Sequence, residues 1–281
     1  MSRISNNEFS LFREYIIDIC GIAIPQEKAY LIETRLTKLM IDVGAETFGE
    51  LYSHIKSSSD PSISQKIIDA ITTNETLWFR DGLPWKFLEE VYLPKLVEEI
   101  ASGKKARARI WCSAVSTGQE AYSTVMCVDN YLRKNHVHGV SLSDFDFLAT
   151  DISCRVLDIA KKGVYDKISI MRGLSDQNRA RYFEEKGAAW AIDPRIRDAV
   201  KFKCFNLKGN YQLLGHFDII FCRYVLIYFS MDLKRETIAK MHDALTEGGV
   251  LFTGNYVLYD LFEDGYDTNH FENLTYYTKG K

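Results

Sequence analysis

The sequence lacks the features of a secreted, membrane-spanning or disulfide-rich protein. Residues 1–15 contain no apolar signal-peptide core, and no apolar run approaches the roughly 20 residues that a membrane helix needs. The cysteines form no C-x-x-C pair and have no histidine cluster nearby, so neither a metal site nor a disulfide framework is expected. We expect a cytoplasmic protein in which all six are small core residues: Cys20, Cys112, Cys127, Cys154, Cys204 and Cys222.

An excess of charge of either sign is also missing. The 35 Lys and Arg residues nearly balance 38 Asp and Glu residues, giving a formal net charge of -3. There is thus no overall basic field to attract nucleic acid or an anionic membrane. The 281 residues, 46% hydrophobic and 13% aromatic, are enough for one large or two modest domains with a well-buried core.

The N-terminal part has apolar residues at helical spacing and no strand candidate. Turn signals divide it: Gly21 and Pro25 follow the first apolar segment, Gly44 follows the second, and residues 57–61 precede a fourth that begins near Ser62. We therefore predict a small helical domain over residues 1–71.

The rest of the chain alternates between strand and helix patterns, which predicts an α/β domain over residues 72–281 with a doubly wound parallel sheet. The expected strands are Ala108–Ala114, Asp144–Thr150, Phe217–Cys222 and Val250–Gly254, and the expected helices are Leu83–Ile100, Ala121–Leu132, Cys154–Lys161 and Asp232–Leu245.

Three segments of this domain depart from simple alternation. Residues 164–203, with short strand candidates at Ala189–Ile192 and Val200–Phe205, are expected to form an inserted subdomain. Glu247–Gly249 is expected to be a turn that caps a helix before the last parallel strand. The tail, residues 269–281, alternates around a predicted hairpin turn and should add antiparallel edge strands.

The loop after the first expected strand, Ala114–Glu120 (AVSTGQE), has small residues where backbone amides can approach a ligand. The G-x-G-x-x-G pattern of dinucleotide enzymes is absent, and only Gly118 remains. This disfavours NAD or FAD and suits a nucleoside without phosphates, such as S-adenosylmethionine. A plain tight turn is the alternative explanation.

Candidate ligand-binding residues follow two further strands. Asp151 comes directly after one strand, where it can accept hydrogen bonds from ribose hydroxyls or cap the following helix, a role that Ser153 can also fill. Arg223 and Tyr228 follow another strand and face the crevice where open α/β sheets bind ligands. By composition alone, Tyr228 would more often be a core aromatic, because apolar residues surround it in the sequence.

Upstream of the sheet, residues 72–81 (TTNETLWFRD) combine short polar side chains, aromatic residues and one arginine. Leu77, Trp78 and Phe79 can anchor this segment and leave Arg80 available. The alternative is a connector between helices in which Arg80 pairs with a nearby acid.

Taken together, these blocks resemble the CheR family of chemotaxis-receptor glutamate methyltransferases. The matching motifs are TTN-x-T-x-x-FR at residues 72–80, GQE at 118–120, the LATDIS run at 148–153, and FCR and IYF within 217–229. The resemblance implies a Rossmann-like S-adenosyl-L-methionine domain, a small all-α N-terminal domain and an inserted β-subdomain. It implies that Arg80 and Tyr228 act at the reaction centre and that the cofactor is released as S-adenosyl-L-homocysteine. The residues that the resemblance implies as cofactor contacts are Asn74, Thr76, Arg80, Gly118, Glu120, Asp151, Asn206, Leu207, Arg223 and Tyr228.

The implied reaction is an in-line methyl transfer to a glutamate carboxylate. An ordinary glutamate, with a pKa of about 4.3, is ionised at neutral pH, so no general base is needed. Catalysis then depends on alignment and partial desolvation, with Arg80 holding either the substrate carboxylate or the cofactor carboxylate. The implied partner is the cytoplasmic domain of a methyl-accepting chemotaxis receptor. A basic stripe could dock it or could simply be solvated: Lys28, Arg35 and Lys38.

The chain departs from the family pattern in places that bear on the substrate. Tyr224 replaces the usual Asn, Ala121 replaces the usual Pro, and residues 254–258 (GNYVL) lack the usual Gly-His-Ser-Glu run. The insertion at Glu184–Ile192 is short, so no stable pentapeptide tether to a receptor is expected. A same-fold methyltransferase with another substrate, or a non-catalytic nucleoside-binding regulator, stays open at this point.

Overall fold

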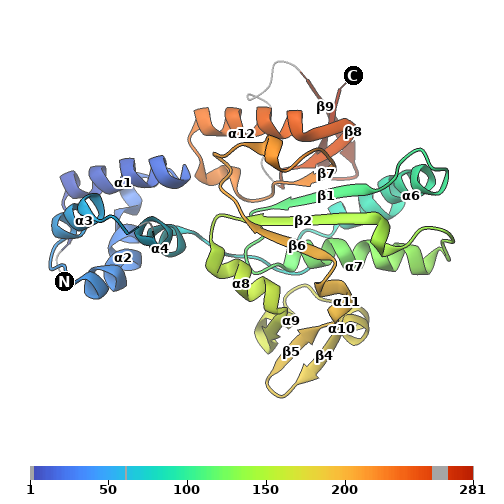
Figure 1. Cartoon of the computed structure of the whole chain (residues 1–281), viewed down its shortest axis with the longest axis horizontal. Coiled ribbons are helices and arrows are strands. Elements are labelled where there is room, and N and C mark those ends of the chain that lie inside the picture. The colour runs from blue at the N-terminus through green and yellow to red at the C-terminus, as the bar shows by residue number, and fades with distance from the viewer. Residues whose placement is uncertain (1–2, 61, 255–264, 281) are drawn as a thin grey trace.

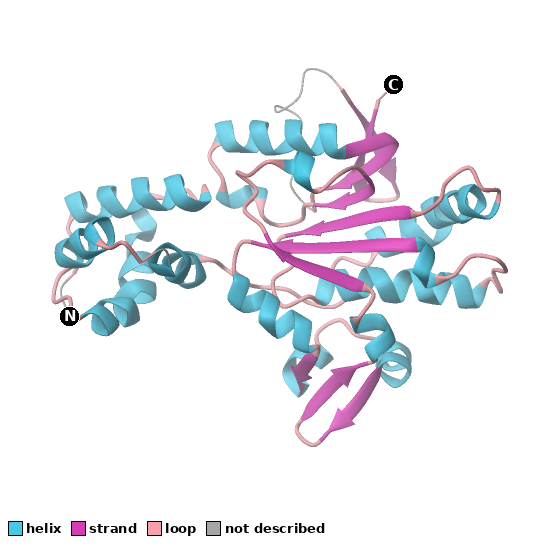
Figure 2. Cartoon of the chain, viewed as in Figure 1, coloured by secondary structure: helices cyan, strands magenta, loops and turns pink. Residues whose placement is uncertain are grey.

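The chain folds into a cluster of N-terminal helices beside a mixed sheet, with a smaller sheet projecting from it (Figures 1 and 2). The computed structural model describes residues 3–60, 62–254 and 265–280. Of the unusual run at 254–258, only Gly254 falls within the described residues. No helix in these ranges combines the length and apolar character that crossing a bilayer requires.

The N-terminal helices begin and end at the predicted turn signals. Ser5 and Glu8 form a capping box at the start of the first helix, and Gly21 ends it in the left-handed conformation with φ 76°. Gly44 ends the second helix in the same way. Phe12, Ile16, Leu36 and Ile67 meet in one apolar cluster. The helices are α1 (Asn6–Cys20), α2 (Ala29–Val43), α3 (Phe48–Ser57) and α4 (Ser62–Ile71).

The large sheet has the strand order β6-β2-β1-β7-β8-β10-β9. The first five strands are parallel, and the C-terminal hairpin extends the sheet in antiparallel fashion, as predicted. The strands are β1 (Ala108–Ser113), β2 (Phe145–Asp151), β6 (Val200–Cys204), β7 (Phe217–Phe221), β8 (Leu245–Phe252), β9 (Tyr266–Phe271) and β10 (Leu274–Lys279).

Alternating side chains of the central strands enter two separate cores, one on each face of the sheet. Ile110 and Phe221 join the core that includes the helices between residues 83 and 134, whereas Trp111 and Ile220 join the core under the helix that precedes β8. Both faces are therefore covered, as in a doubly wound fold. The covering helices are α5 (Leu83–Phe87), a π turn (Leu88–Tyr92), α6 (Leu93–Ala101), α7 (Gln119–Lys134), α8 (Cys154–Lys162) and α12 (Met231–Ala244).

Two details of the sheet differ from the sequence prediction. Glu247–Gly249 does not form a helix cap but lies within β8, where the register with β7 shifts between Phe217 and Ile219. The segment Val200–Phe205, predicted to belong to the insertion, instead supplies β6, which pairs in parallel with β2. Pairing with a buried parallel strand satisfies the backbone of β6, a contact that short-range patterns do not reveal.

The insertion forms a three-stranded antiparallel sheet with the order β3-β5-β4. A two-residue turn, Gly187 and Ala188, joins β4 to β5. The insertion consists of β3 (Val164–Asp166), α9 (Lys167–Met171), α10 (Asp176–Tyr182), β4 (Phe183–Lys186) and β5 (Ala189–Ile192), followed by α11 (Pro194–Arg197).

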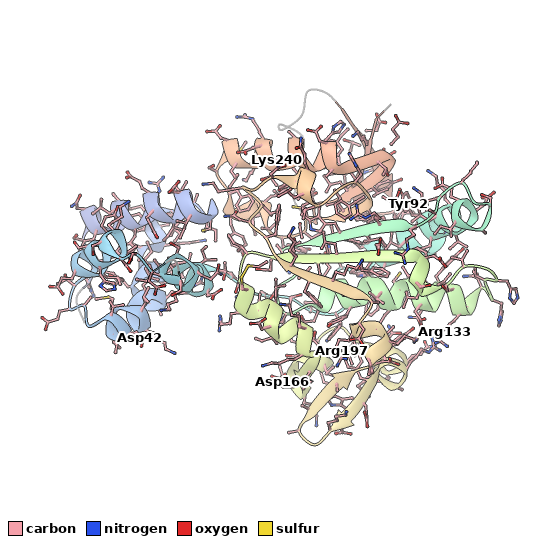
Figure 3. All side chains as sticks on the ribbon, in the orientation of Figure 1. Asp42, Tyr92, Arg133, Asp166, Arg197 and Lys240 are labelled. Atoms are coloured by element: carbon pink, nitrogen blue, oxygen red, sulfur yellow. A yellow bond between two sulfur atoms is a disulfide. The ribbon has the colours of Figure 1, made fainter. Side chains whose placement is uncertain are left out.

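A buried carboxylate on α7 holds the insertion against the main domain. Asp129 accepts hydrogen bonds from Arg133 (2.7 Å), whose side chain is labelled in Figure 3, from Arg195 (2.7 Å) and from the Tyr182 hydroxyl (2.8 Å). Burial by itself would raise the pKa of Asp129, but these donors outweigh burial and hold the pKa below its usual range. Both arginines are about half exposed, so water screens part of the attraction.

The cysteine prediction is wrong for one pair. Cys154, the first residue of α8, forms a disulfide with Cys204, the last residue of β6, with the two Cα atoms 5.3 Å apart. The parallel pairing of β6 with β2 brings these two chain segments together although 50 residues separate them. The other four cysteines are free and buried, as expected.

Asp129→Asn should destabilise the fold by about 1–3 kcal/mol in urea unfolding at pH 7, because the amide attracts the arginines less and one acceptor becomes a donor. Asp129 has a lowered pKa in the folded chain, so its stabilising contribution is present above the unfolded value of about 3.9 and is lost as the pH falls through the folded pKa. The matched control is Asp146→Asn, whose partners Arg107 and Lys201 are exposed, and it should cost less than about 1 kcal/mol. Equal losses in the two variants would contradict the role of Asp129.

Protein purified without reductant should contain four titratable thiols after unfolding, because two of its six cysteines are joined. Reduction should lower the free energy of unfolding by up to about 4 kcal/mol, since a crosslink across a long loop restricts the unfolded chain. Urea titrations with and without dithiothreitol measure this difference. A Cys154→Ser/Cys204→Ser variant should not respond to reductant, and six thiols in the unreduced wild-type chain would contradict the disulfide.

Candidate functional site

A cavity of about 400 Å³ lies at the carboxyl ends of the parallel strands β1, β2, β6 and β7. Its lining comes from the loops that follow these strands, from residues 71–80, and from the segment between α1 and α2. Its size is within the range typical of small-ligand sites, and its position is where open α/β sheets bind ligands.

Backbone strain is concentrated around this cavity. Of the seven non-glycine residues with positive φ in the described ranges, five lie in three loops at the cavity. They are Phe79, Asp81, Ala114, Ser116 and Tyr224. Left-handed conformations are costly for such residues, and clustering of this kind is typical of functional sites.

The Asp151 carboxylate is buried at the cavity and organises the two loops beside it. Its two oxygens accept hydrogen bonds from the backbone amides of Ser116 (2.8 Å) and Ser153 (2.9 Å). Ser153, not Asp151, caps α8. Burial raises the pKa of Asp151, and the amide hydrogen bonds oppose that rise. A carboxylate has about four lone-pair sites, more than these amides occupy, so Asp151, which lines the cavity, can also accept bonds from ligand hydroxyl groups.

The strap formed by residues 72–81 is fixed at several points. Trp78 is buried and bonds through its backbone and its indole to Arg172 and Ser169 in the insertion, each at 3.0 Å. The Phe79 amide donates to the Ser123 hydroxyl on α7. The carbonyl of Asn74 accepts a bond from the Ser116 hydroxyl. These anchors place Asn74, Thr76 and Arg80, three of the residues expected to contact the cofactor, on the cavity wall.

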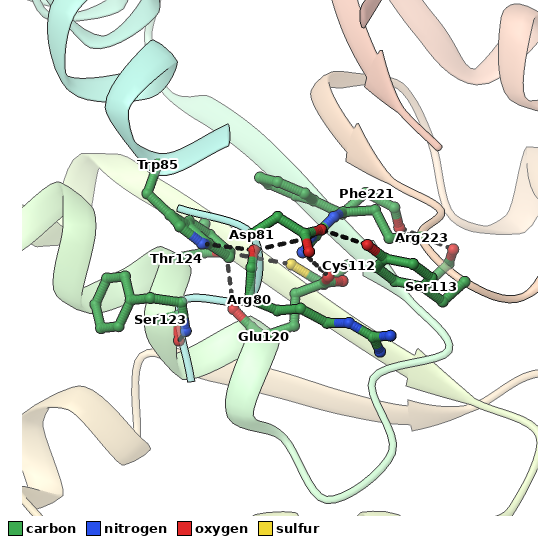
Figure 4. Close-up of polar contacts among 12 residues, drawn as sticks. Arg80, Asp81, Trp85, Cys112, Ser113, Glu120, Ser123, Thr124, Phe221 and Arg223 are labelled. Carbon is green, nitrogen blue, oxygen red and sulfur yellow. Dashed lines mark hydrogen bonds and ion pairs between the residues drawn. The ribbon is translucent and has the colours of Figure 1, made fainter. Parts of the chain in front are cut away.

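A buried guanidinium, that of Arg223, ties this strap to the sheet (Figure 4). It donates to Glu120 on α7 (2.8 Å), to the backbone carbonyl of Arg80 (2.8 Å) and to the carboxylate of Asp81. Burial raises the pKa of Glu120, and the positive charge of Arg223 opposes that rise. Arg223 and Glu120 both line the cavity, but each already has a strong protein partner.

The guanidinium of Arg80, unlike that of Arg223, is not surrounded by carboxylates in the described ranges. Figure 4 shows its side chain extending away from Arg223, and its guanidinium carbon lies 3.4 Å from the centre of the Tyr224 ring. No carboxylate among the described residues forms an ion pair with Arg80. The alternative in which Arg80 pairs with a nearby acid is thus not observed among the described residues, and the donors of Arg80 can serve an anionic ligand group.

The remaining predicted residues differ in whether they line the cavity and in whether their polar groups are free. Tyr228 and Leu207 line the cavity. Asn206 also lines it, but its side-chain amide donates to the carbonyl of Ile19 at the end of α1. Gly118 is not part of the wall. A Cβ at Gly118 would lie 2.9 Å from that of Ala160, so packing against α8 explains the glycine.

The predicted basic stripe is divided by the fold. Lys28 and Arg35 line the cavity, whereas Lys38 does not. Arg35 donates to the Ile71 carbonyl and to the Thr73 hydroxyl (3.1 Å), so it fastens α2 to the strap. Its donors are therefore used within the chain.

Sequence reasoning overlooked several residues of the site. Ser116 and Asp81 lie in the segments 114–120 and 72–81, but their sequence context assigns them no role. Tyr224 is marked only as a replacement of the Asn that is usual at this position. The segment Ile22–Pro25 closes one side of the cavity, and the amide of Ala23 donates to the carbonyl of Tyr228 (2.8 Å). No local sequence signal marks that contact between distant segments.

The arrangement fits a nucleoside that carries an amino acid group. Asp151 offers acceptors for sugar hydroxyls, Arg80 offers donors for a carboxylate, and Leu207 adds an apolar surface. These groups come from different loops and face one cavity. The observed residues therefore accommodate the cofactor class expected from the sequence.

Comparison with known proteins supports this interpretation. Residues 74–260 match the family described as CheR methyltransferase, SAM binding domain, and residues 7–72 match the CheR methyltransferase all-alpha domain. The chain is 42% identical over 251 residues to chemotaxis protein methyltransferase 1 of Pseudomonas aeruginosa, covering 89% of each protein. It is 38% identical over 252 residues to the chemotaxis protein methyltransferase of Vibrio anguillarum, again covering 89% of each. A Listeria monocytogenes protein of the same description is 33% identical over 234 residues, covering 83% of each.

Asp151→Asn should weaken binding of S-adenosylhomocysteine at least about tenfold, because an amide replaces one of the acceptors available to ligand hydroxyls. The ionised carboxylate is the better acceptor, so wild-type affinity should fall as the pH drops through the raised pKa of Asp151. Calorimetric titrations between pH 5 and pH 8 measure both effects, and the affinity of the Asn variant should vary less. Unchanged affinity in the variant would remove Asp151 from the binding site.

Proposed function

Because the chain belongs to the CheR methyltransferase family, we propose that it transfers the methyl group of S-adenosylmethionine to glutamate side chains on the cytoplasmic helices of chemotaxis receptors, forming glutamyl methyl esters. The proposed site of action is the cytoplasm, where those helices lie. The observation that carries the proposal is that Asn74, Thr76 and Arg80 of the strap line the same cavity as Asp151 and Tyr228.

S-adenosylmethionine, when bound, supplies a methyl group on a positively charged sulfur. The role of the protein is to hold and orient the reacting groups. Asp151 offers acceptors for hydroxyl groups, and Arg80 offers a guanidinium without a protein carboxylate partner in the described ranges. A substrate glutamate is already ionised at neutral pH, so no side chain has to remove a proton.

Exclusion of water is the second contribution of the chain. The strap covers the cavity on one side, and Ile22–Pro25 covers it on another through the bond between Ala23 and Tyr228. Partial desolvation of a carboxylate makes it a stronger nucleophile, and alignment at short range lowers the barrier further. The N-terminal helices are thereby part of the proposed active site.

The receptor partner is proposed to dock without a pentapeptide tether. The turn between β4 and β5 has only two residues, which supports this view because it offers little loop to hold an added peptide. Lys28, at the cavity rim and exposed, can attract an acidic receptor helix. Arg35 is less available because it bonds the strap.

Incubation with methyl-labelled S-adenosylmethionine and a receptor cytoplasmic fragment should label the fragment, and mild base should release the label as methanol. Arg80→Ala should reduce kcat/KM by about 10- to 100-fold, because a charged hydrogen-bond partner of a carboxylate is lost. Lys104→Ala, on an exposed loop away from the cavity, serves as the matched control. Label that resists mild base would indicate another nucleophile, and cofactor binding without transfer would indicate a non-catalytic regulator.

A further inference from the structure

The guanidinium of Arg80 lies over the face of the Tyr224 ring. The distance of 3.4 Å between the guanidinium carbon and the ring centre is the shortest cation-ring contact found among the described residues. A guanidinium this close must stack face to face, because an N–H pointing at the ring would hold the carbon further away. Stacking leaves the N–H edges of Arg80 free for a carboxylate.

The Tyr224 side chain has two further neighbours, Asp81 and Gly254. The Tyr224 hydroxyl donates to Asp81 at 2.6 Å, and Asp81 also accepts a bond from the buried Arg223. Burial raises the pKa of Tyr224, so its hydroxyl stays protonated as a donor at neutral pH. A Cβ at Gly254 would lie 3.3 Å from the ring, so glycine at that position leaves room for it. Tyr224 thus connects Arg80 to Asp81 and, through Asp81, to the buried Arg223.

This placement comes at a conformational cost. Tyr224 has φ 59°, a left-handed conformation that a bulky residue rarely adopts and that strains the backbone. Asn or Gly would adopt the same backbone with less strain. Neither would supply a ring beneath Arg80, so the strain is consistent with a role for the side chain in function.

We propose that Tyr224 is a positioning residue that fixes the guanidinium of Arg80 so that its N–H edge faces the carboxylate bound in the cavity. The inference rests on the proposed function, because it concerns the efficiency of the same site. Arg80 has several rotatable bonds and no carboxylate partner in the described ranges, so without the ring it would sample several orientations. The stacked ring reduces that freedom before any ligand binds.

A double-mutant cycle tests this role. Tyr224→Asn suits the left-handed backbone but removes the ring, and it should reduce kcat/KM for methyl transfer by about 3- to 30-fold, the range of a cation-ring contact. Tyr224→Phe keeps the ring but loses the bond to Asp81, and its loss should be smaller, about 2- to 4-fold. In an Arg80→Ala background, Tyr224→Asn should change kcat/KM by less than about twofold. Equal effects in both backgrounds, or no effect of Tyr224→Asn, would overturn the inference.

Two controls separate this role from misfolding and from failure of the proposed reaction. The urea midpoints of both Tyr224 variants should stay close to that of the wild-type chain, because relief of backbone strain in the Asn variant offsets part of the lost ring contacts and Phe preserves the packing of the ring. If the wild-type chain transfers no methyl group, the proposed function fails but the inference can still be tested. Phenylglyoxal should then modify Arg80 faster in Tyr224→Asn than in the wild-type chain, as followed by mass spectrometry, and equal rates would overturn the inference.

Discussion

The buried guanidinium of Arg223 is the interaction on which the rest of the site depends. It joins α7 through Glu120, the strap through the Arg80 carbonyl, and Asp81 through its carboxylate. A buried arginine is costly unless acceptors compensate its charge, so these partners are held in fixed positions. Together with the anchors at Trp78 and Phe79, this cluster orients the strap, and with it Arg80.

The contacts between the N-terminal helices and the sheet domain gather at the edge of the cavity. Lys208 and Asn206 donate to carbonyl groups at the end of α1, where a helix leaves acceptors unsatisfied. Asp69 on α4 accepts a bond from Ser153, the cap of α8, and Ser153 in turn donates its amide to Asp151. The helices and the cofactor loops therefore share a continuous hydrogen-bond network.

Much of the fold followed from local patterns. Apolar spacing located the helices from α1 to α4, and strand and helix alternation predicted the covered parallel sheet, since both depend on which side chains face a core. The pairing of strands that are distant in the sequence was not predicted. β6 and the disulfide between Cys154 and Cys204 both result from the contact of β6 with β2, and no short-range pattern specifies which strands become neighbours.

At the site, sequence alone determined the family and most of the residues that meet at the cavity, because motif residues at strand ends must converge at one edge of a parallel sheet. Only the tertiary structure decided what each residue does there. Arg223 and Arg80 are both arginines at the same cavity, yet one is committed to Glu120 and Asp81 while the other rests on the Tyr224 ring with free donors. The difference arises from which groups surround each guanidinium in space, and that depends on segments more than 100 residues apart in the chain.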